Sequence, residues 1–418
     1  MWTWRHIKFY LYLLWGLFWR SSRQFISHPV KSSVQNFRTL KRVVSVPRFR
    51  REKDFPTSSS PLQEVHGGQT WQKLGDKFVC DFSVTTSVLG PPRGAIRAAR
   101  RSLPLIDHYP EQDAFEARKA LAEFTDWPAE QLLLGNGASE FIDLCLRGNP
   151  EATWRPGPWP CQFMEYERSA KANGLIKQEW NHNDPFNTDV DYTIIVNPSS
   201  PTGDYMSLKE LEIHIAATEC VWVIDESFIT CKGPDWRKHS CLNLVEKYPG
   251  RIIIIVSWTK VYACPGLRIG SVASTQDVIN NIQSIQVPWS VNIPAQKFII
   301  SAVRDRKFMR RTWYVVPRLK KRTERLLKRL GFTPNSNSPS WVPWVYVDCH
   351  SEKVAARLHD VALDAGLPVR HCKSFGQPTF LRLGIRTSLH QNMLFKAWLR
   401  DQELYNLFFN RVSNEKVE

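Results

Sequence analysis

One lysine lies where an amine could do chemistry. Lys260 follows residues 251–256, an apolar run of β-branched side chains that predicts a strand buried on both faces. Ser257 and Thr259 lie beside it, and Arg268 follows eight residues later. A lysine removed from water loses pKa and becomes a usable amine, and the hydroxyls and guanidinium can surround a phosphate. This combination suits pyridoxal 5′-phosphate (PLP), which a lysine carries as a Schiff base. A surface loop is the alternative for these residues alone.

Two further strand ends supply groups of the same kind. Ala138 and Ser139 follow a glycine after the apolar residues 132–134 and open a helix, so free backbone amides and the helix dipole can hold a phosphate. Asp225 closes the apolar run 221–224. A buried carboxylate is costly unless it is paired, and the protonated ring nitrogen of PLP is the partner that we expect. A helix cap is the alternative for Asp225.

The order of elements predicts an α/β fold. Strands alternate with helices from residue 93 onward, which favours a parallel sheet with right-handed crossovers. Ligands bind such sheets at the carboxyl ends of the strands, where all these motifs lie. We expect strands at 132–134, 192–196, 221–224, 251–256, 344–347 and 380–383, and helices at 95–103, 114–124, 141–146, 208–218, 311–330 and 353–365.

Composition divides the chain into four parts. Residues 1–53 form a basic N-terminal segment, 54–92 a polar arm, 93–305 a large domain and 306–418 a small α+β domain. The formal charge of +16 is concentrated at the start, because residues 1–51 hold eleven Lys or Arg and no acid. The remaining 45 basic and 40 acidic residues nearly balance, so no nucleic-acid-binding face is predicted. The nine cysteines lack a paired pattern and indicate reduced thiols, and no metal site is expected.

The N-terminal segment favours targeting to an organelle, a mitochondrion or a plastid. Its Arg- and Ser-containing, acid-free composition is typical of transit peptides. The aromatic run 9–19 is shorter than the roughly 20 residues of a membrane span. It could instead lie at a membrane surface, which leaves membrane contact through residues 1–53 as an alternative. A cytoplasmic protein with an unrelated extension is the third interpretation.

These motifs resemble the fold type I PLP enzymes of the class I/II aminotransferase family, over nearly all of residues 66–386. Within the family the similarity is greatest to the L-threonine-O-3-phosphate decarboxylase branch, with the histidinol-phosphate aminotransferases as neighbours. The resemblance implies a PLP-dependent transferase fold with a mostly parallel seven-stranded sheet between helices. It rests on His66-Gly67-Gly68, Asp81-Phe82-Ser83, His108-Tyr109-Pro110, Gly135-Asn136-Gly137, Thr259 to Gly270 and Val287-Pro288-Trp289-Ser290-Val291-Asn292.

The resemblance also implies a role for each matching residue. Lys260 and Asp225 become the catalytic lysine and the partner of the cofactor's ring nitrogen. The expected cofactor contacts are Ala138, Ser139, Ser257 and Arg268 at the phosphate, Phe163 or Tyr166 stacked on the ring, Ser200 near its 3-oxygen, and Tyr109 reaching the partner subunit's phosphate, which implies a homodimer. Arg386 and Arg370 are expected to bind anionic groups of an amino-acid substrate, with His66 and Gly67 in a turn around the ligand.

Three departures from the family pattern leave the reaction open. The asparagine that usually bonds the 3-oxygen is Ser200, for which a water or Asn197 could compensate, and Phe228 replaces a common tyrosine. Residues 85–88 replace asparagines and a proline on the substrate side. The bond held perpendicular to the cofactor ring is the one that breaks, and sequence does not reveal that torsion. Decarboxylation of O-phosphothreonine or a related amino acid is the first hypothesis, transamination the second, and cofactor binding without turnover the third.

Overall fold

The structure, a computed structural model, describes residues 67–183 and 190–406. The expectations for His66 and for residues 1–53 lie outside this part of the chain. The strands form a seven-stranded and a four-stranded sheet. The first holds β1 (Leu132–Asn136), β2 (Thr153–Pro156), β3 (Ile176–Lys177), β4 (Tyr192–Val196), β5 (Val221–Asp225), β6 (Ile252–Ser257) and β7 (Ile269–Ala273); the second holds β8 (Thr333–Pro334), β9 (Trp344–Asp348), β10 (Arg370–His371) and β11 (Phe380–Gly384).

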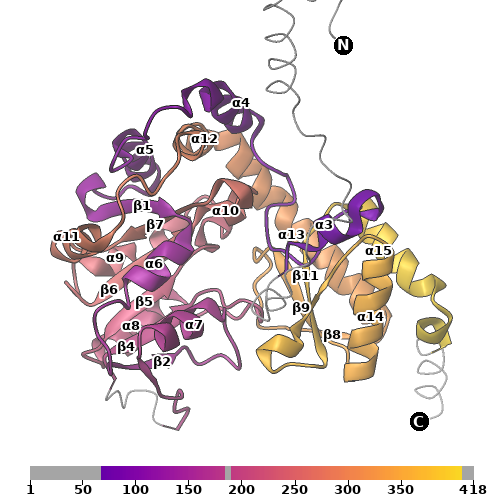
Figure 1. The fold of residues 1–418 in the computed structure, drawn as a ribbon. Helices are drawn as coiled ribbons and strands as arrows, with labels where there is room; N and C mark the ends of the chain where they lie inside the picture. The colour runs from indigo at the N-terminus through magenta and orange to yellow at the C-terminus, as the bar shows by residue number, and fades with distance from the viewer. Residues whose placement is uncertain (1–66, 184–189, 407–418) are drawn as a thin grey trace, which may run out of the picture. The chain divides into compact units, whose positions relative to one another are not determined.

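The seven strands lie in the order β1-β7-β6-β5-β4-β2-β3 (Figure 1). The strands from β6 to β3 pair in parallel, and β7 is antiparallel to both of its neighbours, β1 and β6. Only β7 is therefore reversed, which confirms the predicted mostly parallel sheet. As a consequence, β1, β5 and β6 end at one edge of the sheet, and the residue before β7, Arg268, starts from that same edge.

Helices cover both faces of this sheet, as the isoleucine run of β6 predicted. Ile252 and Ile254 belong to one core cluster and Ile253 and Ile255 to another, because successive side chains of a strand point to opposite faces. The first cluster includes residues of α4 (Arg93–Ser102), α5 (Phe115–Thr125), α8 (Leu208–Ala216), α9 (Leu242–Val245), α10 (Trp258–Val261) and α12 (Ile293–Val303); the second includes residues of α6 (Ala138–Leu144), α7 (Glu165–Ala172) and α11 (Gln276–Ile285).

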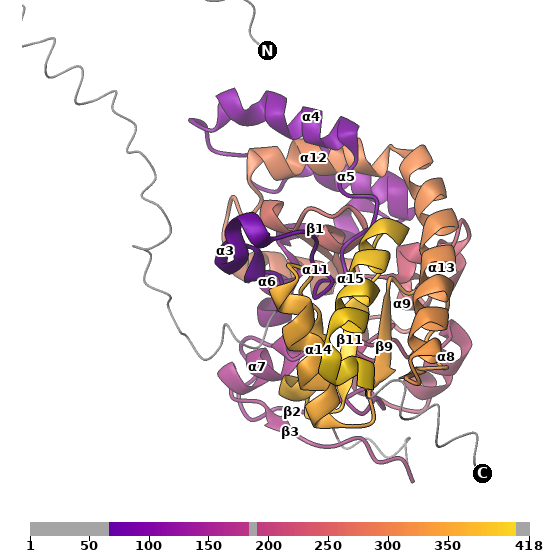
Figure 2. The ribbon, with the colours of Figure 1, turned by 90° about the vertical axis from the view of Figure 1, so that its right-hand side faces the viewer.

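The four-stranded sheet has its own core on one face, and its other face joins the core of the seven-stranded sheet. In Figure 2, α14 (Glu352–Asp364) and α15 (Ser388–Arg400) lie side by side in front of it. Leu381 and Leu383 of β11 pack against these helices in a third core cluster, to which Phe82 of the arm also belongs. Phe380 and Tyr346 on the other face join the first cluster instead. The strand alternation of β11 therefore turns one row of side chains toward the large sheet.

The helix α13 (Arg306–Arg329) makes contacts with both parts, touching the 3-10 turn η5 (Ile229–Cys231) and the strands β8 and β9. It begins five residues before the predicted start, because the Asp305 side chain accepts the Phe308 N–H (2.9 Å) and caps the first turn. A short helix, α3 (Thr70–Leu74), starts the described chain. No helix in the described residues is long and apolar enough to cross a membrane.

Candidate active site

Lys260 lies in α10, one turn past the end of β6. Its pKa is lowered from 10.5 to about 8, chiefly because the amine is removed from water. The nearby positive charge of Arg382 lowers the pKa further and Arg268 adds a smaller effect, whereas the carboxylate of Asp225 opposes both. An amine with this pKa is partly neutral near physiological pH and can act as a nucleophile or exchange protons.

Asp225 ends β5 and is almost fully buried. The Tyr166 hydroxyl donates to one carboxylate oxygen (3.0 Å) and the Ser227 N–H to the other (2.9 Å). Burial raises the pKa of Asp225 despite these hydrogen bonds, so the site favours an additional cationic partner. Because Tyr166 is fully buried and bonded to Asp225, its role here is to orient the carboxylate. Phe163, whose ring is 6.4 Å from Tyr166 and nearly perpendicular to it, is left as the ring-stacking candidate.

The expected phosphate ligands meet at the same edge. Arg268 donates from Nη2 to Ser139 Oγ (3.1 Å), across the turn that opens α6. Gly137 in that turn has φ +82°, and a Cβ there would lie 2.1 Å from the Arg268 guanidinium. The turn therefore requires glycine, since only glycine leaves room for the guanidinium beside the amides of α6.

Backbone pairing brings the remaining phosphate ligands to this turn. Ser257 pairs with Gly270 across β6 and β7. A Cβ on Gly270 would lie 2.2 Å from the backbone nitrogen of Ala138. The Ser257 and Thr259 hydroxyls are hydrogen-bonded to each other at 2.7 Å. Hydroxyls, helix-terminal amides and a guanidinium thus converge next to Lys260, which is the chemistry of a phosphate site.

The arm passes directly over the lysine. The Ser87 N–H donates to the Lys260 carbonyl (2.9 Å), and Thr85 is buried. The expected Gly67 turn packs on Ser83, whose Oγ accepts the Gly68 N–H (3.2 Å). The segment that departs from the family pattern therefore does border the Lys260 edge, where a substrate would enter.

Arg382 is a site residue that sequence reasoning missed. It lies on the row of β11 side chains that faces the large sheet, and it donates to the predicted ligand Ser200 and to the arm. Nη1 donates to Ser200 Oγ (2.8 Å) and Nη2 to the Ser83 carbonyl (2.7 Å). Its buried Nε has no hydrogen-bond partner within the described residues. Burial lowers the pKa of Arg382 to about 10, so an anion at this position would be strongly favoured.

A signal for Arg382 existed in the sequence. Leu381 and Leu383 were expected in the strand 380–383, and the period of two places Arg382 on the opposite face from both. A charged residue inside such a strand, facing another domain, indicates a ligand or an ion partner.

The two predicted substrate arginines differ in their surroundings. Arg386 is buried and donates to the carbonyls of Asp81 (2.6 Å), Val84 (2.8 Å), Thr86 (2.9 Å) and its own neighbour in the chain. In this arrangement it anchors the arm, and its role at a substrate stays a prediction.

Arg370 contacts its own neighbours in the chain, and its role at a substrate also stays a prediction. Its Nη2 donates to Ser374 Oγ (2.6 Å), and its guanidinium lies 5.3 Å from the Phe375 ring centre. Burial lowers its pKa, and its positive charge in turn lowers the pKa of Arg382. Two mutually repelling guanidinium groups in one buried region favour a ligand with more than one negative charge.

Three other expectations are clarified by the structure. Asn197 cannot easily compensate for Ser200, because both ends of its amide already bond the backbone of Met206 at 2.8 and 2.9 Å. Phe228 packs edge-on against Trp344, with ring centres 4.6 Å apart.

Tyr109 lies on the surface of its own chain. It is 80% exposed, and its ring packs on Trp289 at 4.8 Å.

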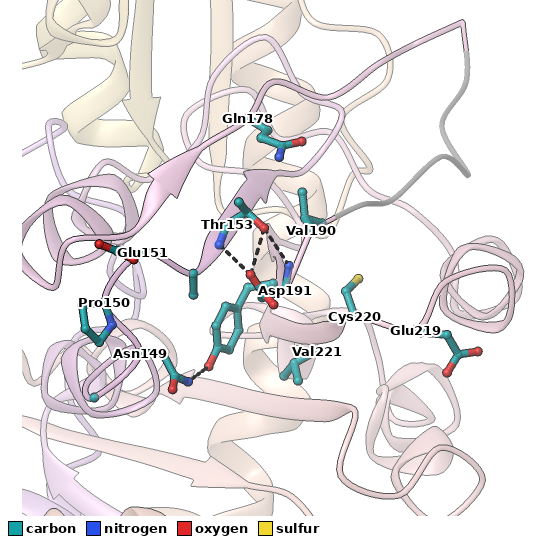
Figure 3. Close-up of a pocket in the computed structure, with 13 residues that line it drawn as sticks. Asn149, Pro150, Glu151, Thr153, Gln178, Val190, Asp191, Glu219, Cys220 and Val221 are labelled. Carbon is teal, nitrogen blue, oxygen red and sulfur yellow. Dashed lines mark hydrogen bonds between the residues drawn. The ribbon is translucent and has the colours of Figure 1, made fainter.

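A cavity lies elsewhere, at the opposite edge of the sheet (Figure 3). It measures about 950 Å³ and is lined by residues at the starts of β2, β4 and β5. Asp191 accepts hydrogen bonds from the N–H (2.7 Å) and hydroxyl (2.9 Å) of Thr153, and Asn149 donates to the Tyr192 hydroxyl. None of its described lining side chains has a buried polar atom without a partner. These groups satisfy one another, so the cavity does not compete with the Lys260 edge as a catalytic site.

Comparison with known proteins agrees with the geometry. Residues 81–397 match the model of the family described as aminotransferase class I and II. The chain is 24% identical to histidinol-phosphate aminotransferase 1 of Mannheimia succiniciproducens over 360 residues, 82% of this chain and 94% of the other.

Solved structures of the same fold extend this similarity. Histidinol-phosphate aminotransferase from Sinorhizobium meliloti in complex with pyridoxal 5′-phosphate aligns with a TM-score of 0.70 at 17% identity, covering 82% of this chain and 97% of that one. L-threonine-O-3-phosphate decarboxylase from Porphyromonas gingivalis aligns with a TM-score of 0.62 at 21% identity, covering 76% and 98%. At these identities the likeness establishes the fold.

The residues at the Lys260 edge fit PLP. Asp225 is a buried carboxylate whose raised pKa favours a cationic partner, and the turn around Gly137 leaves helix amides and the Arg268 guanidinium together for a phosphate. When bound, PLP supplies a conjugated ring that accepts the electron pair of a bond broken at the substrate's α-carbon. Lys260, Asp225 and the phosphate ligands would hold it. The chain belongs to the aminotransferase class I and II family and is a PLP-dependent enzyme.

Proposed function

We propose that this enzyme removes the carboxylate from an amino acid that carries a second anionic group, O-phosphothreonine or a related phosphorylated hydroxy amino acid. The observation that carries this proposal is a pair of neighbouring guanidinium groups largely removed from water: the charge of Arg382 acts on Lys260, and the charge of Arg370 acts on Arg382. A guanidinium binds a carboxylate or a phosphate through two parallel hydrogen bonds, so two of them suit a substrate with both groups. The likeness to a decarboxylase of this substrate class supports the same assignment.

Each residue has a distinct task in this proposal. Arg382 and Arg370 hold the two anionic groups and so orient the bonds at the α-carbon. Lys260, with a pKa near 8, can hold a proton and return it to the α-carbon after carbon dioxide leaves. The arm covers the site through the hydrogen bond of Ser87 to the Lys260 carbonyl, which helps to exclude water.

Transamination is the second candidate, and the similarity to histidinol-phosphate aminotransferases over 94% of a relative's length favours it. The same residues serve both reactions, because the orientation of the α-carbon selects the bond that breaks. Histidinol phosphate carries one anionic group, so it would use only one of the two guanidinium groups.

Product analysis separates the candidates. The PLP-loaded protein is incubated with O-phosphothreonine and O-phosphoserine as the candidate substrates, and with threonine and histidinol phosphate as controls that each lack one of the two anionic groups. Mass spectrometry then detects amines and carbon dioxide, or oxo products in the presence of an oxo-acid acceptor. Decarboxylation predicts an amine phosphate from the phospho-amino acids only. Oxo products without carbon dioxide would contradict the first proposal and support the second, and a yellow protein that forms neither product would point to binding without turnover.

We also propose that the enzyme works as a homodimer, with Tyr109 reaching into the partner's site. Tyr109 and Trp289 form part of an exposed apolar surface on one face of the chain, which also includes Leu103, Leu105, Ile106 and Val287. Monomers usually expose apolar residues singly, so a surface that gathers several of them suits a subunit interface. Sedimentation measures the mass directly. A Tyr109→Ala protein that remains dimeric but loses PLP affinity would support the reach across the interface, whereas unchanged affinity would contradict it.

For residues 1–53 we propose a targeting role in an organelle. The support is the acid-free basic composition of this segment. Sequencing the mature N-terminus from cells tests it, since a start near residue 54 is expected after cleavage. An intact N-terminus in a membrane fraction would favour the membrane-contact alternative.

A further inference from the structure

A second cavity lies on the large domain, away from the Lys260 edge. It measures about 420 Å³ and is bounded by α5, by the 3-10 turn η6 (Trp236–His239), and by the junction of α12 with α13. α5 and α12 pack against each other in the upper part of the molecule in Figure 1. None of the residues proposed for catalysis or cofactor binding lines this cavity.

The lining is strongly positive. Arg237, Arg304, Arg306 and Arg310 contribute four guanidinium groups, and Glu123 is the one acid among the lining residues. Arg304, Arg306 and Arg310 are exposed, and the described part of the chain gives them no ion pair or side-chain hydrogen bond. Cations that outnumber the acids around a concave surface raise the local concentration of anions.

Arg237 is fixed in place at the wall. Its Nε donates to the Phe124 carbonyl (2.9 Å), and Nη2 donates to the same oxygen. Its guanidinium lies 5.1 Å from the Trp236 ring centre and 5.4 Å from that of Phe124. Because these contacts immobilise the side chain, its remaining N–H groups are held in fixed positions. Less conformational entropy is therefore lost when they bind a ligand.

Flat aromatic walls accompany the charges. Phe124 and Trp236 are stacked with ring centres 5.6 Å apart. Trp313 lines the cavity from α13, and its indole N–H donates to the Thr230 carbonyl (2.8 Å), which fixes the plane of its ring. Rigid indole rings offer faces on which a planar ligand ring can stack.

We propose that this cavity binds a small polyanion that carries a planar ring, a nucleoside phosphate in chemical class. Its phosphates would contact Arg304, Arg306 and Arg310, and its base would lie against Trp313, the partly exposed indole of the lining. The volume lies within the range of about 300–1,000 Å³ that small-molecule sites occupy. An inorganic anion would leave the aromatic walls without a partner, and an uncharged ring would leave the arginines without one.

The same walls touch the elements that hold the catalytic residues. Phe124 packs edge-on against Trp258, with ring centres 5.9 Å apart, and Trp258 lies two residues before Lys260 in α10. Trp313 bonds η5, which begins four residues after Asp225. A ligand in the cavity therefore contacts side chains that pack directly on the catalytic segments.

Calorimetric titration of the PLP-loaded protein with ATP, free of Mg²⁺, tests the proposal. Adenosine and inorganic tripolyphosphate are the ring-only and charge-only probes. We expect saturable ATP binding that is at least about tenfold tighter than that of either probe, because ring and phosphates bind together. Absence of saturable ATP binding, or tripolyphosphate binding as tight as ATP, would overturn the proposal.

The helix α13 provides a matched control for charge. The double variant Arg306→Gln with Arg310→Gln removes two lining cations. Lys307→Gln with Arg311→Gln removes two exposed cations from neighbouring positions outside the lining. We expect the first pair to weaken ATP binding at least about tenfold and the second by no more than about twofold. Equal weakening by both pairs would mean unspecific attraction and would overturn the proposal. All four positions are exposed, and thermal melts verify folding; Arg304→Gln serves as the replacement should the first pair fail to fold.

Discussion

The two edges of the seven-stranded sheet present two carboxylates in opposite states. Asp225 ends β5 at the edge that holds Lys260, and burial raises its pKa. Asp191 precedes β4 at the other edge, beside the cavity of about 950 Å³, and hydrogen bonds from Thr153 lower its pKa. The first carboxylate is deprived of water and favours a cationic partner. The second is already satisfied by its neighbours and by solvent.

This difference shows which physical property marks the site. The cavity of about 950 Å³ at the Asp191 edge offers more volume, but its polar groups pair with each other. At the Lys260 edge, burial shifts the pKa of the lysine to about 8 and that of Arg382 to about 10. Groups held in such states cost folding free energy and persist where a ligand or a reaction uses them. Uncompensated charge, and not volume, distinguishes the catalytic edge.

Lys260→Ala should produce the largest effect. Loss of the amine removes both the attachment of PLP and the proton carrier, so we expect turnover to fall by at least about a thousandfold. The measurement is product formation at saturating substrate, with circular dichroism to verify the fold. Because Lys260 lies in a helix of only one turn, we expect the variant to fold normally. A variant that keeps a tenth of the activity would contradict the assignment.

Substituting each carboxylate tests the comparison itself. Asp225→Asn keeps the shape but removes the negative charge, and we expect kcat/KM to fall by about a hundredfold or more, with weaker PLP retention. Asp191→Asn is the matched change at the opposite edge, for which we expect kcat/KM within about twofold. Steady-state kinetics and the cofactor's absorbance after dialysis measure both. A comparable loss in the two variants would break the distinction between the edges.

Arg382 in β11 and Arg386 just after the strand should differ in effect: loss of the first should weaken substrate binding, and loss of the second should lower stability. For Arg382→Gln we expect a rise in KM of about ten- to a hundredfold with a small change in the free energy of unfolding, because a guanidinium with an unbonded Nε is available to an anion. For Arg386→Gln we expect a loss of about 3 kcal/mol in the free energy of unfolding, because several arm carbonyls lose their donor. Urea denaturation and kinetics distinguish them, and the reverse outcome would assign the substrate to Arg386.

The pH dependence of Lys260 offers the smallest and sharpest test. Below its pKa the amine is a protonated ammonium, and above it the amine is neutral and able to react. The rate at which the cofactor-free protein takes up PLP should therefore rise with pH around a midpoint of about 8, in place of the usual 10.5. In Arg382→Gln the midpoint should move upward, because the cation that lowers the pKa is removed. A midpoint near 10 in the unaltered protein would show that the lysine is hydrated.

The sequence alone predicted much of this arrangement. Strong local patterns marked the isoleucine run of β6, the aspartate that ends β5 and the glycine turn before α6. The parallel topology then brings those strand ends to one edge. Elements that the pattern did not reveal, such as β2, β7 and α12, have mixed sequences whose burial comes from neighbours far along the chain. The start of α13 was missed because a single cap at Asp305 extends the helix beyond its apolar pattern.

Sequence therefore determined that Lys260, Asp225 and the turn around Gly137 lie at one edge of the sheet, since each depends on residues that are close in the chain or on the direction of parallel strands. Tertiary structure alone decided which arginine faces Lys260. Arg382 and Arg386 lie four residues apart, yet one donates to Ser200 beside the site and the other to the carbonyls of the arm. The reason is physical: contacts between segments some 180 to 300 residues apart arise from packing of two sheets, which no local pattern encodes.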